Sequence, residues 1–481
     1  MKKTISILLI PFILVTFSYS QTISLQNNPE LTEKIVLFEK WIQTQMEYRG
    51  IVGLSIGIVY NKDLIWTKGF GYANKEKKIP ATPETIYRIA SISKTFTSTA
   101  IMQLRDAGKL RLDDPITKYL PWFKIHNPFK DTPEITIEQL LTHSSGLPGE
   151  AAFPYWTDHV FPTLEEIKQK LQEQEMLYPT ATKYSYSNLG IAILGPIIEE
   201  VSGETYEQYM QNHILNPLDL SGTSIDIKND AKNLPKLAKA YGRRLPDGTH
   251  LFPTFTDSKG LTPAANLSSC VVDLAKYISF QINGFDPVLK TSTLREMHRV
   301  HWLQPHWKSG WGLGWGIRKQ GERTIVSHGG WVGGYRSQVS FCPIDKIGIV
   351  VLTNSDDADA GIFITQFYEN IAPLILSIVK PSVPEFKFNP DWAEYVGKYR
   401  DPWYYDTDVM KIEERLAIYS YNYPPEEDPF EQMSLLTPVG KDTFRLADEN
   451  GNGELVIFIK GKDTKIAQIK IGENYSVRVN E

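Results

Sequence analysis

The sequence predicts an α+β fold: an antiparallel sheet flanked by helices, an all-helical lobe beside it, and a small C-terminal all-β barrel or sandwich. Two observations predict the main part. Strand-like runs occur early, after Gly53, and again after Trp311, whereas the residues between them carry helical patterns. An antiparallel sheet built from both ends of this region and covered by helices is the simplest arrangement for that order. The length of 481 residues indicates more than one compact unit.

Strand-like segments supply the predicted sheet. Residues 53–74 contain two apolar runs separated by Asn-Lys-Asp, which is the pattern of a β-hairpin. Further strand-like runs, divided by turns such as Pro-Ile-Asp-Lys, follow at 311–320, 323–330, 335–343 and 346–354. We expect the early hairpin and the late strands to pair with one another.

Helical patterns fill the middle of this region. Residues 97–107 place apolar side chains on one face and end before Gly108, a typical helix stop. The same spacing recurs at 187–203, 205–215 and 268–282. These segments predict the helical lobe and the helices that cover the sheet.

Residues 1–20 have the features of a secretory signal peptide. Lys2 and Lys3 precede an apolar run, and small residues follow it. The run is too short to span a bilayer, and we expect no transmembrane segment after signal removal. The mature protein is therefore expected to be periplasmic or secreted.

The rest of the chain divides at a proline-punctuated stretch. We expect one large domain at 21–380, a linker at 381–390 and a small domain at 391–481. The last segment has short strand-like runs with partial alternation and few helical signals, which favours a barrel or sandwich.

Composition argues against several classes of function. The formal charge of -5 comes from 51 basic and 56 acidic residues, and the basic ones are dispersed, so nucleic acid is not an expected partner. Cys270 and Cys342 permit one disulfide, but their settings favour two small buried residues.

Three histidines, His298, His301 and His306, lie close together in the sequence. No carboxylate or cysteine completes a set of metal ligands, so we expect solvated loop histidines and no metal or organic cofactor.

The first candidate site is Ser91-Ile-Ser-Lys94. Three residues apart on a helix, the two end residues share a face, so the amine of Lys94 can reach the hydroxyl of Ser91. A neutral amine can accept the proton of a serine nucleophile, and the helix start can stabilise an oxyanion. Alone, the pattern also fits a helix cap with a solvated lysine.

Two further patterns follow later. Tyr186 and Asn188 form Y-x-N before a helix, where a phenol can share in proton transfer and an amide can hold substrate. His328 and Gly330 form H-x-G on a strand, followed by Trp331, whose main-chain N–H could be an oxyanion donor. Separately, these patterns also fit a capped helix entrance and a glycine-rich hairpin.

Together and in this order, S-x-x-K, Y-x-N and H-x-G resemble the serine β-lactamase and penicillin-binding-protein superfamily. The similarity is greatest to its class C β-lactamase, esterase and D-aminopeptidase branch and covers about residues 30–375. Leu141–Pro148 matches a hallmark turn of that family, and no chemical role is assigned to His143.

The resemblance implies a role for each matching residue. Ser91 matches the acylated nucleophile, Lys94 its proton partner, and Tyr186 the acid/base that activates Ser91 and later water. Trp331 matches the second oxyanion donor. The substrate-binding positions that match the family are Asn188, His328, Gly330 and Trp331.

One departure affects the expected substrate. His328 stands where true class C β-lactamases and most penicillin-binding proteins have lysine, and a neutral histidine attracts a substrate carboxylate less strongly. The sequence therefore predicts an exported serine hydrolase for small esters or D-residue peptides. The alternatives are a class C β-lactamase or DD-peptidase, and a non-catalytic protein that binds peptidoglycan fragments or β-lactams. Protein partners are not predicted.

Overall fold

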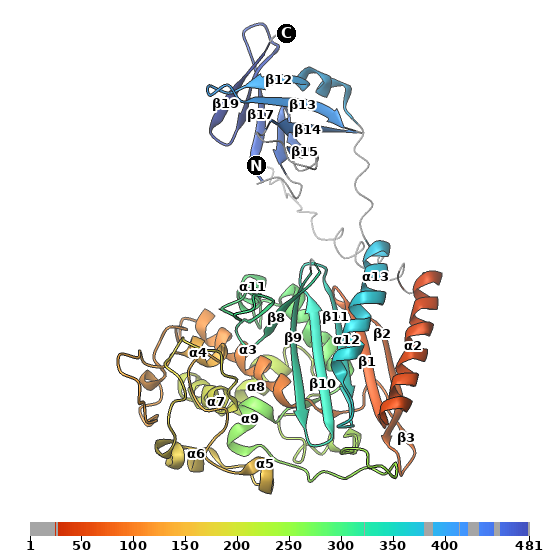
Figure 1. The fold of residues 1–481 in the computed structure, drawn as a ribbon, viewed down its shortest axis with the longest axis vertical. Coiled ribbons are helices and arrows are strands. Elements are labelled where there is room, and N and C mark those ends of the chain that lie inside the picture. Colours follow the sequence, from red (N-terminus) through yellow and green to blue (C-terminus); the bar gives the residue numbers. More distant parts are fainter. Residues whose placement is uncertain are drawn as a thin grey trace, which may run out of the picture. The chain divides into compact units, whose positions relative to one another are not determined.

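The computed structural model describes residues 25, 27–321, 323–379, 388–412, 414–421, 432–446 and 453–479. It separates into two compact units, Met1–Val379 and Lys380–Glu481, each of which is described by itself (Figure 1). The predicted signal peptide and most of the predicted linker lie outside the described residues.

Within the described part of the first unit, nine strands form one antiparallel sheet in the order β3-β2-β1-β11-β10-β9-β8-β7-β6. Strand β1 pairs with β2 on one side and with β11 on the other, which confirms that the early hairpin and the late strands share one sheet. The bounds are β1 (Gly53–Tyr60), β2 (Asp63–Asn74), β3 (Ile79–Pro80), β6 (Trp302–Leu303), β7 (Ser309–Trp311), β8 (Gly316–Gln320), β9 (Arg323–Val332), β10 (Tyr335–Cys342) and β11 (Ile347–Thr353).

One face of this sheet is covered by helices from the two ends of the described part of the unit (Figure 1). They are α2 (Pro29–Arg49), α12 (Ala360–Gln366), the π-helix η7 (Phe367–Ile371) and α13 (Ala372–Val379). By length and composition alone, the continuous helix Ala360–Val379 could cross a membrane. Its buried residues Phe363, Phe367 and Ile371 belong to the core between this layer and the sheet, which accounts for its apolar character.

The helical lobe and the remaining helices lie on the other face (Figure 1). Helix α3 runs through the core, and its residues from Ser93 to Met102 are all buried. The lobe and sheet-covering helices are α3 (Ser93–Asp106), α4 (Ile137–Leu141), α5 (Tyr155–Asp158), α6 (Leu164–Lys170), α7 (Asn188–Ser202), α8 (Tyr206–Met210), α9 (Thr262–Ala265), α10 (Val271–Asn283) and α11 (Thr291–Met297).

Short elements connect these helices. Strand β4 (Tyr87–Arg88) pairs antiparallel with β5 (Ser268–Ser269). In the chain, β4 comes shortly before Ser91, the nucleophile candidate. The short 3₁₀- and π-helices are η1 (Ala90–Ile92), η2 (Ile116–Lys118), η3 (Leu171–Glu173), the π-helix η4 (Gln211–Leu215), η5 (Leu234–Lys236), η6 (Lys259–Leu261) and, in the second unit, η8 (Pro390–Tyr395).

Two expectations about single residue types have different outcomes. Cys270 and Cys342 are buried and free, as expected. The expectation of solvated histidines is wrong for His298, which is 8% exposed and bonds through Nε2 to Gln281 Oε1 at 3.0 Å. His301 is also paired, with Glu138. His298 is buried because the segment after α11 packs against the core. The composition of that segment does not reveal this packing.

The second unit is the predicted all-β domain. Each of its strands pairs antiparallel with the next, and β12 pairs with β19, so the described strands close into a barrel. Its core contains Tyr395, Tyr399, Phe444 and Phe458. The bounds are β12 (Gly397–Arg400), β13 (Asp406–Ile412), β14 (Arg415–Ser420), β15 (Met433–Gly440), β16 (Thr443–Leu446), β17 (Leu455–Lys460), β18 (Ile466–Ile471) and β19 (Asn474–Arg478).

Candidate active site

Ser91 and Lys94 lie together where η1 runs directly into α3. Lys94 Nζ is 3.0 Å from Ser91 Oγ and 2.8 Å from the carbonyl oxygen of Ala264. The neighbouring Ser93 points elsewhere, since its hydroxyl accepts a hydrogen bond from Leu267 N at 3.0 Å. The contact between Ser91 and Lys94 is therefore the contact that the S-x-x-K spacing predicts.

Burial changes the acid–base behaviour of Lys94. Its side chain lies in the core of the lobe at 0% exposure. Desolvation lowers its pKa to about 7, against a smaller opposite effect of the Glu150 carboxylate. A substantial fraction of Lys94 is thus neutral near pH 7, which a proton acceptor for Ser91 requires.

Tyr186 completes this group from the segment before α7. Its hydroxyl is hydrogen-bonded to Ser91, and its ring centroid lies 5.0 Å from Lys94 Nζ. Burial raises the pKa of the phenol well above its ordinary value, and the hydrogen bond from Ser91 offsets this only in part. The resting phenol is therefore protonated, and Lys94 is the group of the three whose pKa lies near neutrality.

Asn188 is the first residue of α7, next to the N-cap Ser187, whose hydroxyl accepts a hydrogen bond from Gly190 N. Asn188 Nδ2 donates to Glu150 Oε1 at 2.7 Å. Glu150 also accepts a hydrogen bond from the Tyr155 hydroxyl. Sequence reasoning missed Glu150, although it is the first carboxylate after the hallmark turn.

His328 on β9 is neutral. It is 5% exposed, and burial together with the charge of Lys94 lowers its pKa to about 3. Nδ1 donates to the carbonyl oxygen of Gly329 at 2.7 Å, so Nε2 is an unprotonated acceptor. Nε2 is buried without a hydrogen-bond partner among the described residues.

Gly330 allows β9 to approach the turn that carries the nucleophile. A Cβ atom at this position would lie 2.1 Å from the carbonyl oxygen of Ile89 and 2.4 Å from Ser337 Oγ. Any side chain here would push β9 away from η1, because such contacts are far inside the van der Waals limit.

Trp331 has a side chain that is 47% exposed and lies against Trp156 of α5, with ring centroids 5.9 Å apart and an interplanar angle of 22°. Its Nε1 donates to Asp356 at 2.7 Å, which fixes the ring, and the Arg336 guanidinium lies 5.3 Å from the ring centroid. The role of its main-chain N–H as an oxyanion donor stays a prediction.

The predicted site residues meet in one cavity of about 760 Å³. Ser91 lines it, while Lys94 lies buried behind Ser91. The other predicted residues on its wall are Tyr186, Asn188, His328, Gly330 and Trp331. Residues that sequence reasoning missed and that also line it are Glu150, Trp156, Trp311 and Arg336.

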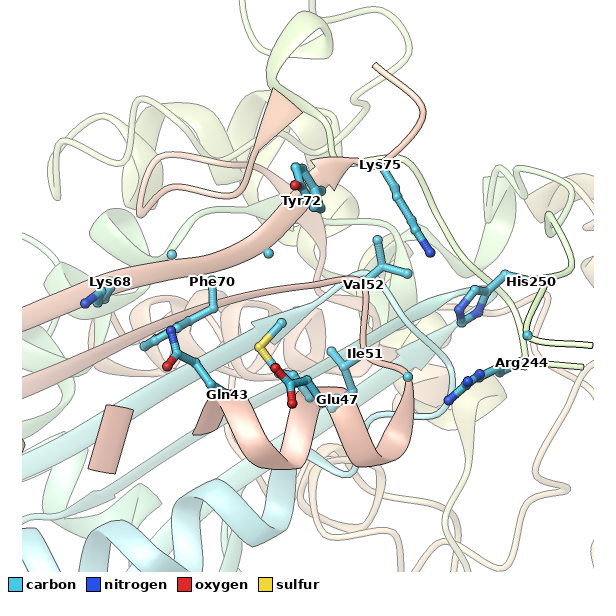
Figure 2. A pocket seen from close by; sticks show the side chains of 15 residues that line it. Gln43, Glu47, Ile51, Val52, Lys68, Phe70, Tyr72, Lys75, Arg244 and His250 are labelled. Atoms are coloured by element: carbon cyan, nitrogen blue, oxygen red, sulfur yellow. The ribbon is translucent and has the colours of Figure 1, made fainter. Parts of the chain in front are cut away.

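A second hollow of about 590 Å³ lies between the end of α2, strand β2 and the segment 242–250. Figure 2 shows Lys75, Arg244 and His250 at one side of it and Gln43 and Glu47 of α2 at the other. It contains none of the predicted site residues, which line the cavity at Ser91 or lie behind it.

The fold and this site define a known class of protein. The family model described as Beta-lactamase matches residues 38–364, more than half of the chain, and the chain belongs to this family. The first unit has a β-lactamase-like hydrolase fold.

Individual proteins show how widely the similarity extends. The chain is 29% identical over 406 residues to "Beta-lactamase-like protein 2" of Dictyostelium discoideum, which covers 81% of this chain and 73% of that protein. The structure of an octameric penicillin-binding protein homologue from Pyrococcus abyssi is 27% identical, with a TM-score of 0.62 over 92% of this chain and 100% of the other. EstCE1, described as a hydrolase with promiscuous acyltransferase activity, shares the fold at 24% identity, with a TM-score of 0.61 over 71% and 99% of the two chains.

Proposed function

We propose that this chain is an exported serine hydrolase that forms an acyl-enzyme at Ser91 and acts on small ester or amide bonds, including those of D-residue peptides. The observation that carries the proposal is the contact of Ser91 Oγ with both Lys94 Nζ and the Tyr186 hydroxyl. Family membership and the fold shared with EstCE1 support the hydrolase class.

In the proposed acylation step, Ser91 Oγ attacks the substrate carbonyl carbon while its proton passes to neutral Lys94, directly or through the Tyr186 hydroxyl. The main-chain N–H groups of Ser91 and Trp331 stabilise the oxyanion. The C–O or C–N bond then breaks, and the leaving group takes a proton from the same pair. Water deacylates Ser91 by the reverse sequence of proton transfers.

The cavity favours uncharged, partly apolar substrates near the nucleophile. His328 is neutral and offers an acceptor nitrogen, so it supplies no positive charge for a substrate carboxylate. Trp156 and Trp331 form an aromatic wall of the same cavity. Small esters and amides without a carboxylate fit these surroundings.

A second candidate is a class C β-lactamase or DD-peptidase, and one observation favours it. Arg336 lines the cavity, and its Nε is buried without a hydrogen-bond partner among the described residues. A guanidinium in that position could bind a substrate carboxylate that His328 does not attract.

The test is active-site labelling with a fluorophosphonate probe, followed by location of the modified peptide and a panel of p-nitrophenyl esters, D-alanyl amides and penicillins. We expect the label on Ser91, no label on Ser91→Ala, and normal labelling of the matched control Ser93→Ala. Penicillin turnover above ester turnover would favour the second candidate. A folded protein that no probe, ester or penicillin acylates would instead indicate a non-catalytic binding protein.

A further inference from the structure

His143 packs against Tyr186 and accepts hydrogen bonds from both neighbours of Tyr186 in the chain, although it is not among the residues that line the cavity at Ser91. It lies just after α4, and it is 1% exposed. Its carbonyl oxygen accepts a hydrogen bond from Ser185 N at 2.8 Å. Its ring nitrogen Nδ1 accepts one from Ser187 N at 3.2 Å. The two residues that flank Tyr186 in the chain are thus both bonded to His143.

The imidazole ring also supports the phenol ring directly. The ring centroids of His143 and Tyr186 are 4.4 Å apart, and Trp311 packs edge-on against His143 at 5.1 Å. The backbone at Ser185 and Ser187 and the ring of Tyr186 are therefore fixed by one side chain and its own carbonyl group. This arrangement restricts where the phenol hydroxyl can point.

The hydrogen bond at Nδ1 determines the tautomer of His143. Because Ser187 N–H donates to Nδ1, that nitrogen is unprotonated and the neutral ring carries its proton on Nε2. Burial and the neighbouring Lys94 and His328 lower the pKa of His143 well below its ordinary value, in agreement with a neutral ring. Nδ1 of His143 therefore stays unprotonated and can accept the hydrogen bond from Ser187 N–H.

The backbone of His143 is held in an unusual conformation. Its φ is +55°, in the left-handed region that few non-glycine residues adopt, with Asn, Asp and His the more frequent among them. Such a conformation costs about 1 kcal/mol and persists where surrounding contacts determine it. Here it allows one residue to present both its carbonyl oxygen and its Nδ1 to the segment Ser185–Ser187.

We propose that His143 is a positioning residue that holds the Tyr186 hydroxyl against Ser91 by accepting hydrogen bonds from both neighbours of Tyr186. The proposal rests on the proposed function, because it concerns the rate at which Ser91 is acylated. It predicts that the acceptor at Nδ1 matters for catalysis, beyond the contribution of the ring to packing.

The test compares two substitutions that both tolerate a positive φ. In His143→Asn the side-chain Oδ1 replaces Nδ1 as the acceptor, whereas His143→Gly removes the acceptor and leaves the backbone carbonyl in place. Each folded variant is measured for kcat, KM and the rate constant of fluorophosphonate inactivation. We expect His143→Asn to stay within about threefold of the parent, and His143→Gly to lose about tenfold or more in kcat and inactivation rate with little change in KM.

The matched control is His298→Asn, which alters another buried histidine that contacts neither Ser91 nor Tyr186. It should lower thermal stability without lowering kcat. Equal loss of kcat in the folded Asn and Gly variants, or parental kcat in a folded Gly variant, would overturn the proposal. If His143→Gly does not fold, a loss of about tenfold or more in a folded His143→Asn variant would still overturn it. Absence of label on the parent's Ser91 would instead refute the proposed function.

Discussion

Lys94 Nζ lies 3.0 Å from Ser91 Oγ in a part of the core where the amine has a pKa of about 7. In the proposed mechanism the neutral amine accepts the proton of Ser91, so activity should fall as pH decreases through this value. We expect an acid limb near pH 7 in kcat/KM for a neutral ester, with the rate falling about tenfold for each pH unit below it. A profile that stays flat to about pH 5 would contradict the role of Lys94.

Removal of the buried amine should increase stability while activity is lost. The pKa of Lys94 is lower in the folded than in the unfolded chain, so the unfolded state binds more protons between about pH 7 and pH 10. The free energy of unfolding should therefore rise with pH over that window. Lys94→Met should abolish this slope and raise the thermal midpoint by about 2 °C or more, as measured by scanning calorimetry. A lower midpoint in Lys94→Met would show that the contacts of the amine outweigh its desolvation.

Tyr186→Phe removes only the hydroxyl that is bonded to Ser91. We expect kcat for ester hydrolysis to fall by about a hundredfold or more, because a proton-transfer group is lost, while KM changes little. The matched control is Tyr184→Phe, which removes the hydroxyl of a partly buried neighbour that is not among the residues lining the cavity. If both variants lose the same activity, the effect is one of packing and not of proton transfer.

His328→Lys tests the origin of substrate charge preference. A lysine at this position would place a positive charge on the wall of the cavity, where the present histidine has a pKa of about 3 and is neutral. We expect KM for carboxylate-bearing esters or penicillins to decrease relative to KM for matched neutral esters. His306→Lys, which adds the same charge at an exposed loop residue, should leave the ratio unchanged. An unchanged ratio in His328→Lys would assign carboxylate recognition to another group, such as Arg336.

Trp331→Ala tests the aromatic wall without removing the main-chain N–H. Loss of the ring that packs on Trp156 should raise KM for aryl-acyl esters by about threefold to tenfold and change KM for acetyl esters much less. Trp307→Ala is the control, since Trp307 is another exposed tryptophan of the same unit that does not line the cavity. Equal effects on both acyl groups would mean that the wall does not contact the acyl chain.

Local spacing was sufficient to predict part of the site. The three-residue separation of Ser91 and Lys94 fixes their shared face at a helix start, and the observed contact follows from that geometry alone. The early and late strands were likewise predictable, because short apolar runs bounded by turns are a local signal. The C-terminal barrel was predicted only as barrel or sandwich, since closure depends on the pairing of β12 with β19, which are far apart in the sequence.

Residues that act through distant contacts were not predictable in this way. Glu150 reaches Asn188, and His143 reaches Ser187, across a chain separation that has no periodic pattern. The solvated state expected for His298 was wrong for the same reason, since its burial depends on elements elsewhere in the chain. Conversely, Gly330 was predicted from the H-x-G pattern, but the surface that it approaches, at Ile89, is visible only in the fold.

The sequence by itself determined the order of strands and helices and the pairing of a serine with a lysine on one helical turn, because each depends on residues close together in the chain. The tertiary structure alone decided that burial lowers the pKa of Lys94 to about 7 and that His143 packs against Tyr186 and bonds to Ser187. Desolvation and the tautomer of a ring depend on what packs around a group in three dimensions, and the segments that do so here come from widely separated parts of the chain.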